Sequence, residues 1–190
     1  STTCNQCHSG IGFIETVKGN TGEDMNLAFG AINCATCHDP HDATNPHQLR
    51  QLDDVTLGNG AVVTDGGYGK LCMNCHKGRR DIRTYIADNL GNPSSHFGPH
   101  HGPQTDMLVG ENAYEYGQRI RSSTHVYAVD NACVTCHMPA TSRDAPEHLM
   151  AGGHTFWASW DGGTPDDPSD DVDLTAGCTG CHGPMDSFDI

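Results

Sequence analysis

The cysteines of this chain, and some of its histidines, recur in a pattern that can hold a metalloporphyrin. Two cysteines three positions apart, with a histidine directly after the second, occur five times. Thiols at this spacing can add to the two vinyl groups of one porphyrin, and the adjacent imidazole then lies beneath the iron as an axial ligand. The sequence therefore predicts covalent haem attachment by Cys4, Cys7 and His8; by Cys34, Cys37 and His38; by Cys72, Cys75 and His76; by Cys133, Cys136 and His137; and by Cys178, Cys181 and His182.

Paired cysteines also bind zinc, which is the main alternative to haem. The histidines decide against zinc. With 13 His in 190 residues, all five pairs would be followed by histidine by chance only about once in a million. The five motifs use all ten cysteines. We therefore expect five haem c groups, and neither zinc nor a redox-active cysteine pair.

Each haem iron has a second axial position, and its ligand separates electron transfer from catalysis. Eight histidines lie outside the motifs, more than five haems need. This surplus favours bis-histidine ligation throughout, which gives low-potential irons and no open position for a substrate. The histidines that we rank as distal ligands, above His47, His101 and His148, are His41, His96, His100, His125 and His154.

The positions of these histidines give the reasons for the ranking. His41 follows His38 by three residues, too close to reach the other face of the same haem, so we expect it to ligate a neighbouring one. His154 lies in a Gly-Gly-His-Thr-Phe turn, where small residues allow close approach to a porphyrin. A methionine could replace a histidine at one iron and raise its potential. The candidates are Met25, Met73, Met107, Met138, Met150 and Met185.

The composition suits a protein whose core is not built from its side chains. Leu, Ile, Val and Phe make up 30 of 190 residues and the net charge is −14, a profile typical of disordered chains. This conflict is removed if the porphyrins form the core, and we then expect the apoprotein to be unfolded. Residues 1–190 should form a single pentahaem domain wrapped around a chain of haems. The backbone should be mostly irregular, because 23 Gly and 10 Pro interrupt it.

Short elements can still be predicted. Residues 55–64 contain two β-branched runs about Asn59-Gly60, a strong signal for a small β-hairpin. Residues 79–90 and 104–120 have helical patterns, the second with interruptions at Gly110 and Gly117, and each haem motif should lie on a turn or short helix. Residues 161–173 are acidic and rich in Gly and Pro, which indicates a solvated loop, with calcium ligation or a docking surface as alternatives.

The acidic balance argues against nucleic acid and anionic lipid as partners. One basic cluster directly follows the third motif. It is either a solvated helix face or a set of partners for haem propionates. Its members are Lys77, Arg79, Arg80 and Arg83.

The cysteine usage indicates an oxidising compartment outside the cytoplasm, where haem is attached after export. No apolar run reaches transmembrane length. No signal peptide is visible and Ser1 lies three residues before Cys4, so we expect the mature form of an exported protein.

Four segments resemble the extracellular multihaem cytochromes of metal-reducing bacteria and related archaea. They are CATCHDPH, LCMNCHKGR, HFGPHHGPQTDMLVG and the CHMP run that ends in GGHTF, and the resemblance covers most of residues 34–156. It implies a protein that accepts electrons from the cell and passes them to minerals, electrodes or partner cells. Small members of this kind are subunits of cytochrome nanowires, in which haems stack and one subunit can supply an axial histidine to the next.

The resemblance favours a homopolymeric, extracellular or cell-surface electron conduit. Motifs near both ends of the sequence would suit such a filament. Redox proteins or extracellular acceptors would be its other partners. A discrete periplasmic or cell-surface shuttle is the main alternative. A multihaem reductase is less favoured, because the pentahaem nitrite reductases carry a lysine in place of one motif histidine and all five motifs here end in histidine. We therefore expect an electron-transfer protein and not an enzyme.

Overall fold

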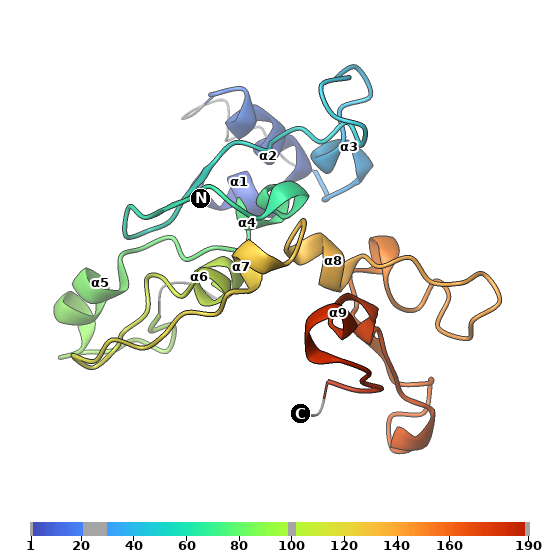
Figure 1. Ribbon diagram of the computed structural model, residues 1–190. Helices are drawn as coiled ribbons and strands as arrows, with labels where there is room; N and C mark the ends of the chain where they lie inside the picture. The colour runs from blue at the N-terminus through green and yellow to red at the C-terminus, as the bar shows by residue number, and fades with distance from the viewer. Residues whose placement is uncertain (1, 21–29, 99–101, 189–190) are drawn as a thin grey trace. The chain divides into compact units, whose positions relative to one another are not determined.

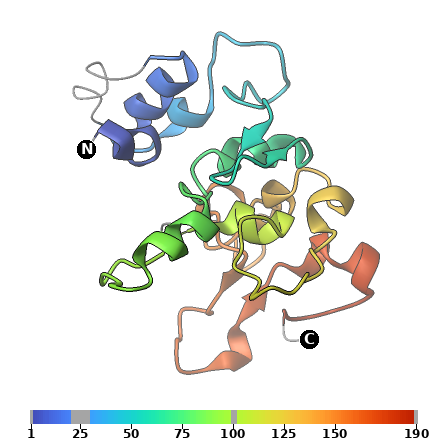
Figure 2. The ribbon, with the colours of Figure 1, turned by 90° about the vertical axis from the view of Figure 1, so that its left-hand side faces the viewer.

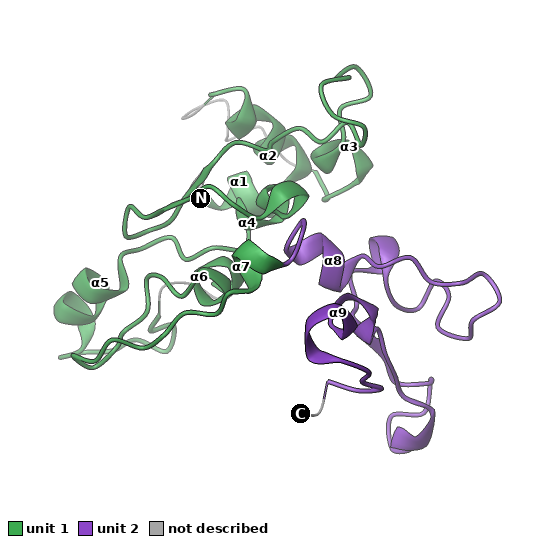
Figure 3. Ribbon diagram, in the orientation of Figure 1, with its two compact units in different colours: residues 1–128 green, residues 129–190 purple. Residues whose placement is uncertain are grey.

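A computed structural model describes residues 2–20, 30–98 and 102–188 (Figures 1 and 2). The chain divides into two compact units, unit 1 (Ser1–Ala128) and unit 2 (Val129–Ile190), shown in separate colours in Figure 3. Most of the backbone is irregular, with short helices, a small antiparallel hairpin (β1 and β2) and a second antiparallel strand pair (β3 and β4). The fold class predicted from the sequence is therefore confirmed. A single pentahaem domain over residues 1–190 stays a prediction.

The elements are short throughout the described residues. None of the helices found there is long and apolar enough to cross a membrane. Unit 1 contains α1 (Thr2–His8), α2 (Gly10–Val17), α3 (Cys34–Cys37), β1 (Val55–Thr56), β2 (Val62–Val63), the 3-10 helix η2 (Gly67–Gly69), α4 (Lys70–Met73), α5 (Ile82–Asn89), α6 (Gln104–Val109) and α7 (His125–Ala128). Unit 2 contains α8 (Cys133–His137), η3 (Gly153–Thr155), β3 (Ser159–Trp160), η4 (Pro168–Asp170), β4 (Val172–Asp173), η5 (Thr175–Gly177) and α9 (Thr179–His182).

The hairpin predicted at residues 55–64 is present as β1 and β2. Val55 pairs with Val63 across the strands, and both side chains are buried. The turn is one residue longer than a two-residue Asn-Gly turn, because Leu57 N–H donates to Ala61 O at 2.8 Å. Gly60 has φ +84°, so it supplies the left-handed residue that three-residue hairpin loops require.

The first predicted helix is confirmed as α5. It begins at Ile82 and not at Arg79, because the Asp81 side chain accepts a hydrogen bond from Arg83 N–H and caps the helix there. Ile82 and Tyr85 are buried on its inner face.

The second predicted helix, at residues 104–120, is wrong beyond Val109. Gly110 has φ +67° and its N–H donates to Met107 O, while Glu111 N–H donates to Asp106 O at 3.0 Å. These two bonds form a Schellman motif, which satisfies the last carbonyls of α6 and turns the chain away from the helix axis. The glycine that interrupts the helical pattern in the sequence therefore ends the helix.

Buried apolar side chains are few and unevenly distributed. Unit 1 holds most of those in the described residues, with Met73 and Val55 almost fully enclosed at 0% and 1% exposure. In the described part of unit 2, the buried apolar side chains are those of Ala132 and Ala151. Two methyl groups supply very little hydrophobic stabilisation. The polypeptide of unit 2 therefore contributes almost no apolar core of its own.

Helices α1 and α2 pack closely at the start of unit 1 (Figures 1 and 2). The buried Ser9 links them, and its hydroxyl accepts a hydrogen bond from Gly12 N–H at 3.2 Å, which caps α2. A Cβ at Gly12 would lie 2.2 Å from the carbonyl oxygen of Asn5 in α1. Glycine is thus required at position 12 because the backbone of α1 occupies the space that a side chain would need.

Replacement of Gly12 by alanine is expected to destabilise the haem-loaded protein by about 1–3 kcal/mol, because the added methyl group would push α1 away from α2. The measurement is the free energy of unfolding from denaturant titration. Gly91→Ala is the matched control, since a Cβ at Gly91 would meet no atom within 4 Å. An equal loss of stability in both variants would contradict the close packing of α1 against α2.

Candidate functional site

Each predicted haem motif lies on a single helical turn. The motifs are numbered here in chain order. Motif 1 lies in α1, motif 2 in α3 and the residue after it, and motif 3 in α4 and the turn after it. Motif 4 lies in α8, and motif 5 runs from Cys178 through α9. Residues three apart on a helix share a face, so both thiols of each motif point to one side. All ten cysteines lie in the described residues and none forms a disulfide. The expectation that each motif occupies a turn or short helix is confirmed.

The helical turn of motif 2 is fixed by its flanking residues. Asn33 caps α3, and its side-chain oxygen accepts a hydrogen bond from Ala35 N–H at 3.0 Å. The hydroxyl of Thr36, which lies between the two cysteines, accepts in return from Asn33 N–H at 3.0 Å. This capping box satisfies two backbone donors of a helix only four residues long. The variable residues of a haem motif can therefore stabilise the turn that carries the thiols.

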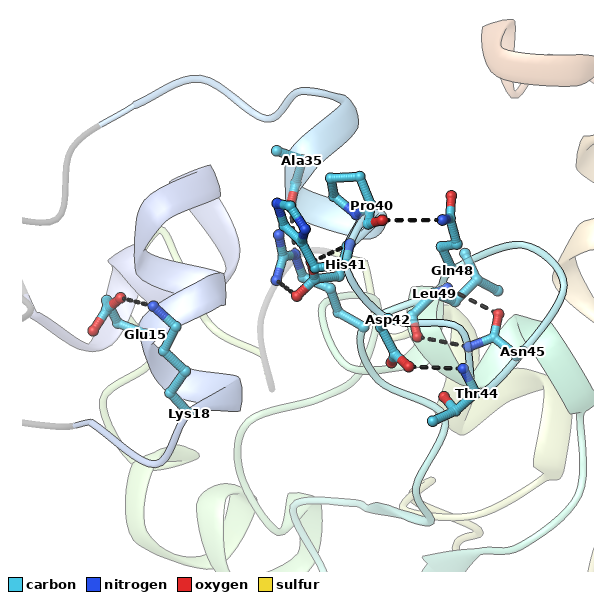
Figure 4. Close-up of polar contacts among 12 residues, drawn as sticks. Glu15, Lys18, Ala35, Pro40, His41, Asp42, Thr44, Asn45, Gln48 and Leu49 are labelled. Atoms are coloured by element: carbon cyan, nitrogen blue, oxygen red, sulfur yellow. Dashed lines mark hydrogen bonds and ion pairs between the residues drawn. The ribbon is translucent and has the colours of Figure 1, made fainter.

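The loop that follows motif 2 is closed by polar contacts (Figure 4). The Arg50 side chain donates to Ala35 O at 2.6 Å and pairs with Asp39 at 2.7 Å, which ties the end of the loop to α3. The Asn45 side chain bonds both backbone groups of Leu49, at 2.9 Å and 3.0 Å. The loop therefore holds its shape through main-chain and side-chain hydrogen bonds.

This loop carries the hydrogen-bond partner of the motif 2 histidine. The His38 Nδ1 atom lies 2.7 Å from the backbone carbonyl oxygen of His47. A carbonyl can only accept, so Nδ1 carries the proton and the lone pair of the ring lies on Nε2. Nε2 is the nitrogen that can bind iron when Nδ1 is held in this way. The imidazole of His38 is thus oriented, and its tautomer is fixed, for metal ligation.

Two other motif histidines have comparable partners. The Nδ1 atom of His137 lies 3.1 Å from Phe156 O, and that of His76 lies 3.3 Å from Gln104 Oε1. No pattern in the sequence predicted these three acceptor residues. The carbonyls of His47 and Phe156 have no sequence signature, because any residue can supply a main-chain oxygen. Thiols on one turn, each followed by an imidazole, three of which are held through Nδ1, fit the needs of a covalently attached haem.

The acceptor for His137 is placed by a glycine turn. Gly152 has φ +70°, and a Cβ there would lie 2.3 Å from Pro139 O. Gly152 N–H donates to Trp157 O at 2.7 Å, and Gly153 N–H donates to Pro139 O at 3.1 Å. These bonds bring the segment around Phe156 against the residues that follow motif 4. The small residues thus allow one backbone to approach another closely, while their predicted role in the approach to a porphyrin stays a prediction.

A buried carboxylate organises the region after motif 3. Asp106 is 4% exposed, and its side chain accepts hydrogen bonds from Gly78 N–H at 2.6 Å and from the Asn112 amide at 2.8 Å. The adjacent Thr105 donates from both its N–H and its hydroxyl to His76 O. Helix α6 therefore supports the third motif through its histidine and the residues just after it.

The basic cluster after motif 3 is not one helix face. Of its four members Arg83 alone lies on α5. Lys77 donates to Thr56 O at 2.7 Å, and the guanidinium of Arg80 lies 4.8 Å from the centre of the Tyr85 ring. Burial lowers the pKa of Lys77. Pairing with haem propionates stays a prediction.

The acidic segment 161–173 runs through an exposed loop to β4, which pairs with β3. The Asp170 carboxylate accepts from the Thr164 hydroxyl at 2.8 Å, and Asp161 accepts from Gly163 N–H at 3.0 Å. Within the described residues no group of three or more His, Cys, Asp or Glu could hold a metal ion. The solvent-exposed loop predicted from the sequence is thus present and is shaped by its own hydrogen bonds.

One thiol of motif 1, on Cys7, lies close to one thiol of motif 3, on Cys75. Interaction with the Cys75 thiol, helped by the positive charges of Arg79 and Lys77, lowers the pKa of Cys7 to about 7. The same contact, together with burial, raises the pKa of Cys75. In unit 2, the pKa of Cys136 is raised mainly by burial, and the nearby Cys178 adds to the effect. Attachment points from different motifs therefore lie near each other in both units.

Four of the five predicted distal histidines lie in the described residues. His41, His96, His125 and His154 are all exposed, and the His154 ring lies 6.1 Å from the Phe156 ring. His100 lies outside the described residues. The assignment of these five residues as distal ligands stays a prediction.

Comparison with known protein families gives a match over part of the chain. A family model described as a doubled CXXCH motif matches residues 28–81, which contain the second and third motifs. No curated protein and no solved structure matches the chain. The doubled motif supports haem c binding and electron transport.

Replacement of Gln104 by leucine is expected to raise the midpoint potential of the haem on motif 3. The hydrogen bond from His76 makes the imidazole a stronger electron donor, which favours ferric iron. One such bond is worth about 1 kcal/mol, so the shift should not exceed about 40 mV. Spectroelectrochemical titration of the haem-loaded protein measures it. The exposed Gln118→Leu is the control, and an equal shift there would exclude a local effect on His76.

Proposed function

The doubled motif indicates a multihaem c-type cytochrome, and we propose that this chain carries electrons through five covalently bound haem c groups. The observation that carries the proposal is the repetition of one geometry. Each motif places two thiols and an imidazole on a single helical turn, from α1 in unit 1 to α9 in unit 2. All five motifs end in histidine, so all five irons have a protein ligand of the same kind.

The chain's own residues fix the orientation of the ligands and the positions of the attachment points. When bound, the haem supplies an iron that gains and loses one electron. The carbonyls of His47 and Phe156 hold the Nδ1 protons of His38 and His137. Arg50 and Asp106 support motifs 2 and 3 through the loops that surround them. None of these residues needs to react, which suits a carrier rather than an enzyme.

We further propose that the chain is a subunit of an extracellular conductive filament. Histidines outside the motifs support this proposal, because His41, His96 and His125 are exposed and a second copy of the chain could reach them. An axial histidine supplied by one subunit to the haem of another would join the haem chains of the two. The net charge of −14 favours redox proteins or extracellular acceptors as further partners over nucleic acid.

The haem count gives the first prediction for this function. The mass of the denatured full-length protein should equal the polypeptide plus five haems, because each thioether pair survives unfolding. Replacing Cys133 and Cys136 by alanine should remove one haem and leave four. Val134→Ala lies between the same cysteines and should keep five, since its position has no role in attachment. Five haems on the double alanine variant would disprove attachment at motif 4.

Electron cryomicroscopy of the native haem-loaded material tests the filament. We expect polymers with an unbroken chain of haems and a histidine from one subunit on a haem of its neighbour. Replacing that histidine by alanine should abolish the polymers, whereas replacing an exposed non-ligating histidine should leave them intact. Single particles with five internal bis-histidine haems would establish a discrete shuttle instead. A five-coordinate iron would indicate an enzyme.

A further inference from the structure

The contact between Cys7 and Cys75 joins two motifs that are far apart in the sequence. Cys7 Sγ lies 3.9 Å from the carbonyl oxygen of Asn74, the residue before Cys75. Each cysteine is the second thiol of its motif and directly precedes the histidine. The attachment points of motifs 1 and 3 therefore lie close together, although motif 2 lies between them in the chain.

A cleft in unit 1 borders both thiols. Its volume is about 350 Å³, and its wall includes Cys7, Phe13, Leu57, Cys75 and Lys77. The apolar side chains of Phe13 and Leu57 are both buried. Both thiols therefore border the same space, which the porphyrins attached to them would share.

We propose that Cys7 and Cys75 hold the haems of motifs 1 and 3 edge to edge, so that electrons pass directly between these two haems and not in sequence order through motif 2. A thioether bond fixes one edge of a porphyrin on its sulfur, so two sulfurs in contact bring two porphyrin edges together. Exchange between them oxidises one ferrous iron and reduces one ferric iron, and no bond or proton moves. The inference rests on the proposed haem electron transfer.

The redox interaction between the two haems tests this proposal in the full-length haem-loaded protein. Methionine as an axial ligand raises the midpoint potential of a haem. His8→Met and His76→Met should therefore each raise the midpoint potential of one haem above those of the other four. In the double variant these two couples titrate together, apart from the others. An electron on one haem repels the next from its neighbour. The double variant has two raised midpoint potentials. We expect the lower of these to lie below the raised midpoint potential of each single variant.

The control is the His8→Met/His38→Met double variant, which joins motifs that are consecutive in the sequence. Its two couples should show a smaller shift from those of the single variants. The proposal would be overturned if the raised midpoint potentials of His8→Met/His76→Met equalled those of the single variants. A larger shift of the midpoint potentials in the control variant would also overturn it. The haem count is measured on the same samples, and a wild-type protein without covalent haem would instead overturn the proposed function.

A structural measurement on the wild-type protein does not depend on these substitutions. An electron cryomicroscopy map of the haem-loaded chain should place the sulfur atoms of Cys7 and Cys75 in van der Waals contact, with the two porphyrins meeting at that point. If the methionine variants lose haem or unfold, this map decides the question. Five attached haems with the Cys7 and Cys75 sulfurs separated by a third haem or by protein would overturn the proposal and leave the proposed function intact.

Discussion

The placement of two thiols and an imidazole on one helical turn is the constraint on which the rest of the structure depends. A turn of this kind needs only four or five residues, and it must recur five times in 190 residues. The helices are accordingly short, and loops fill the intervals between them. The buried Ala132 and Ala151 show how little apolar core the chain builds in unit 2. A large apolar cofactor joined to the chain can supply the hydrophobic surface that the side chains do not.

Hydrogen bonds between side chains and the main chain fix the positions of loops that apolar packing would fix in other proteins. Arg50 joins a loop to α3, and Asp106 joins α6 to the backbone after motif 3. A single bond of this kind contributes only about 0.5–1.5 kcal/mol. These bonds matter mainly for geometry, because each one fixes the orientation of a loop that carries or supports a ligand. Loops built in this way can be irregular and still present a histidine in one orientation.

Sequence patterns predicted the local features and missed the long-range ones. The hairpin at residues 55–64 and helix α5 follow from β-branched runs and helical periodicity, which act over a few residues. Residues 111–120 were wrongly assigned to a helix because the left-handed Gly110 outweighs the helical pattern after it. The acceptors for His38 and His137 are main-chain carbonyls, which carry no mark in the sequence. The contact between Cys7 and Cys75 depends on the path of the chain between them, which no local pattern encodes.

The hydrogen bond from His38 to the carbonyl of His47 has a kinetic consequence. The rate of electron exchange depends on how far nuclei must shift when the charge on the metal changes, a cost known as reorganisation energy. An imidazole held by a main-chain oxygen, in a loop closed by Asn45 and Arg50, cannot turn in response to that charge. Preorganised dipoles need little rearrangement as charge develops. A polar, irregular loop that holds its imidazole in this way can therefore lower the activation barrier of electron exchange.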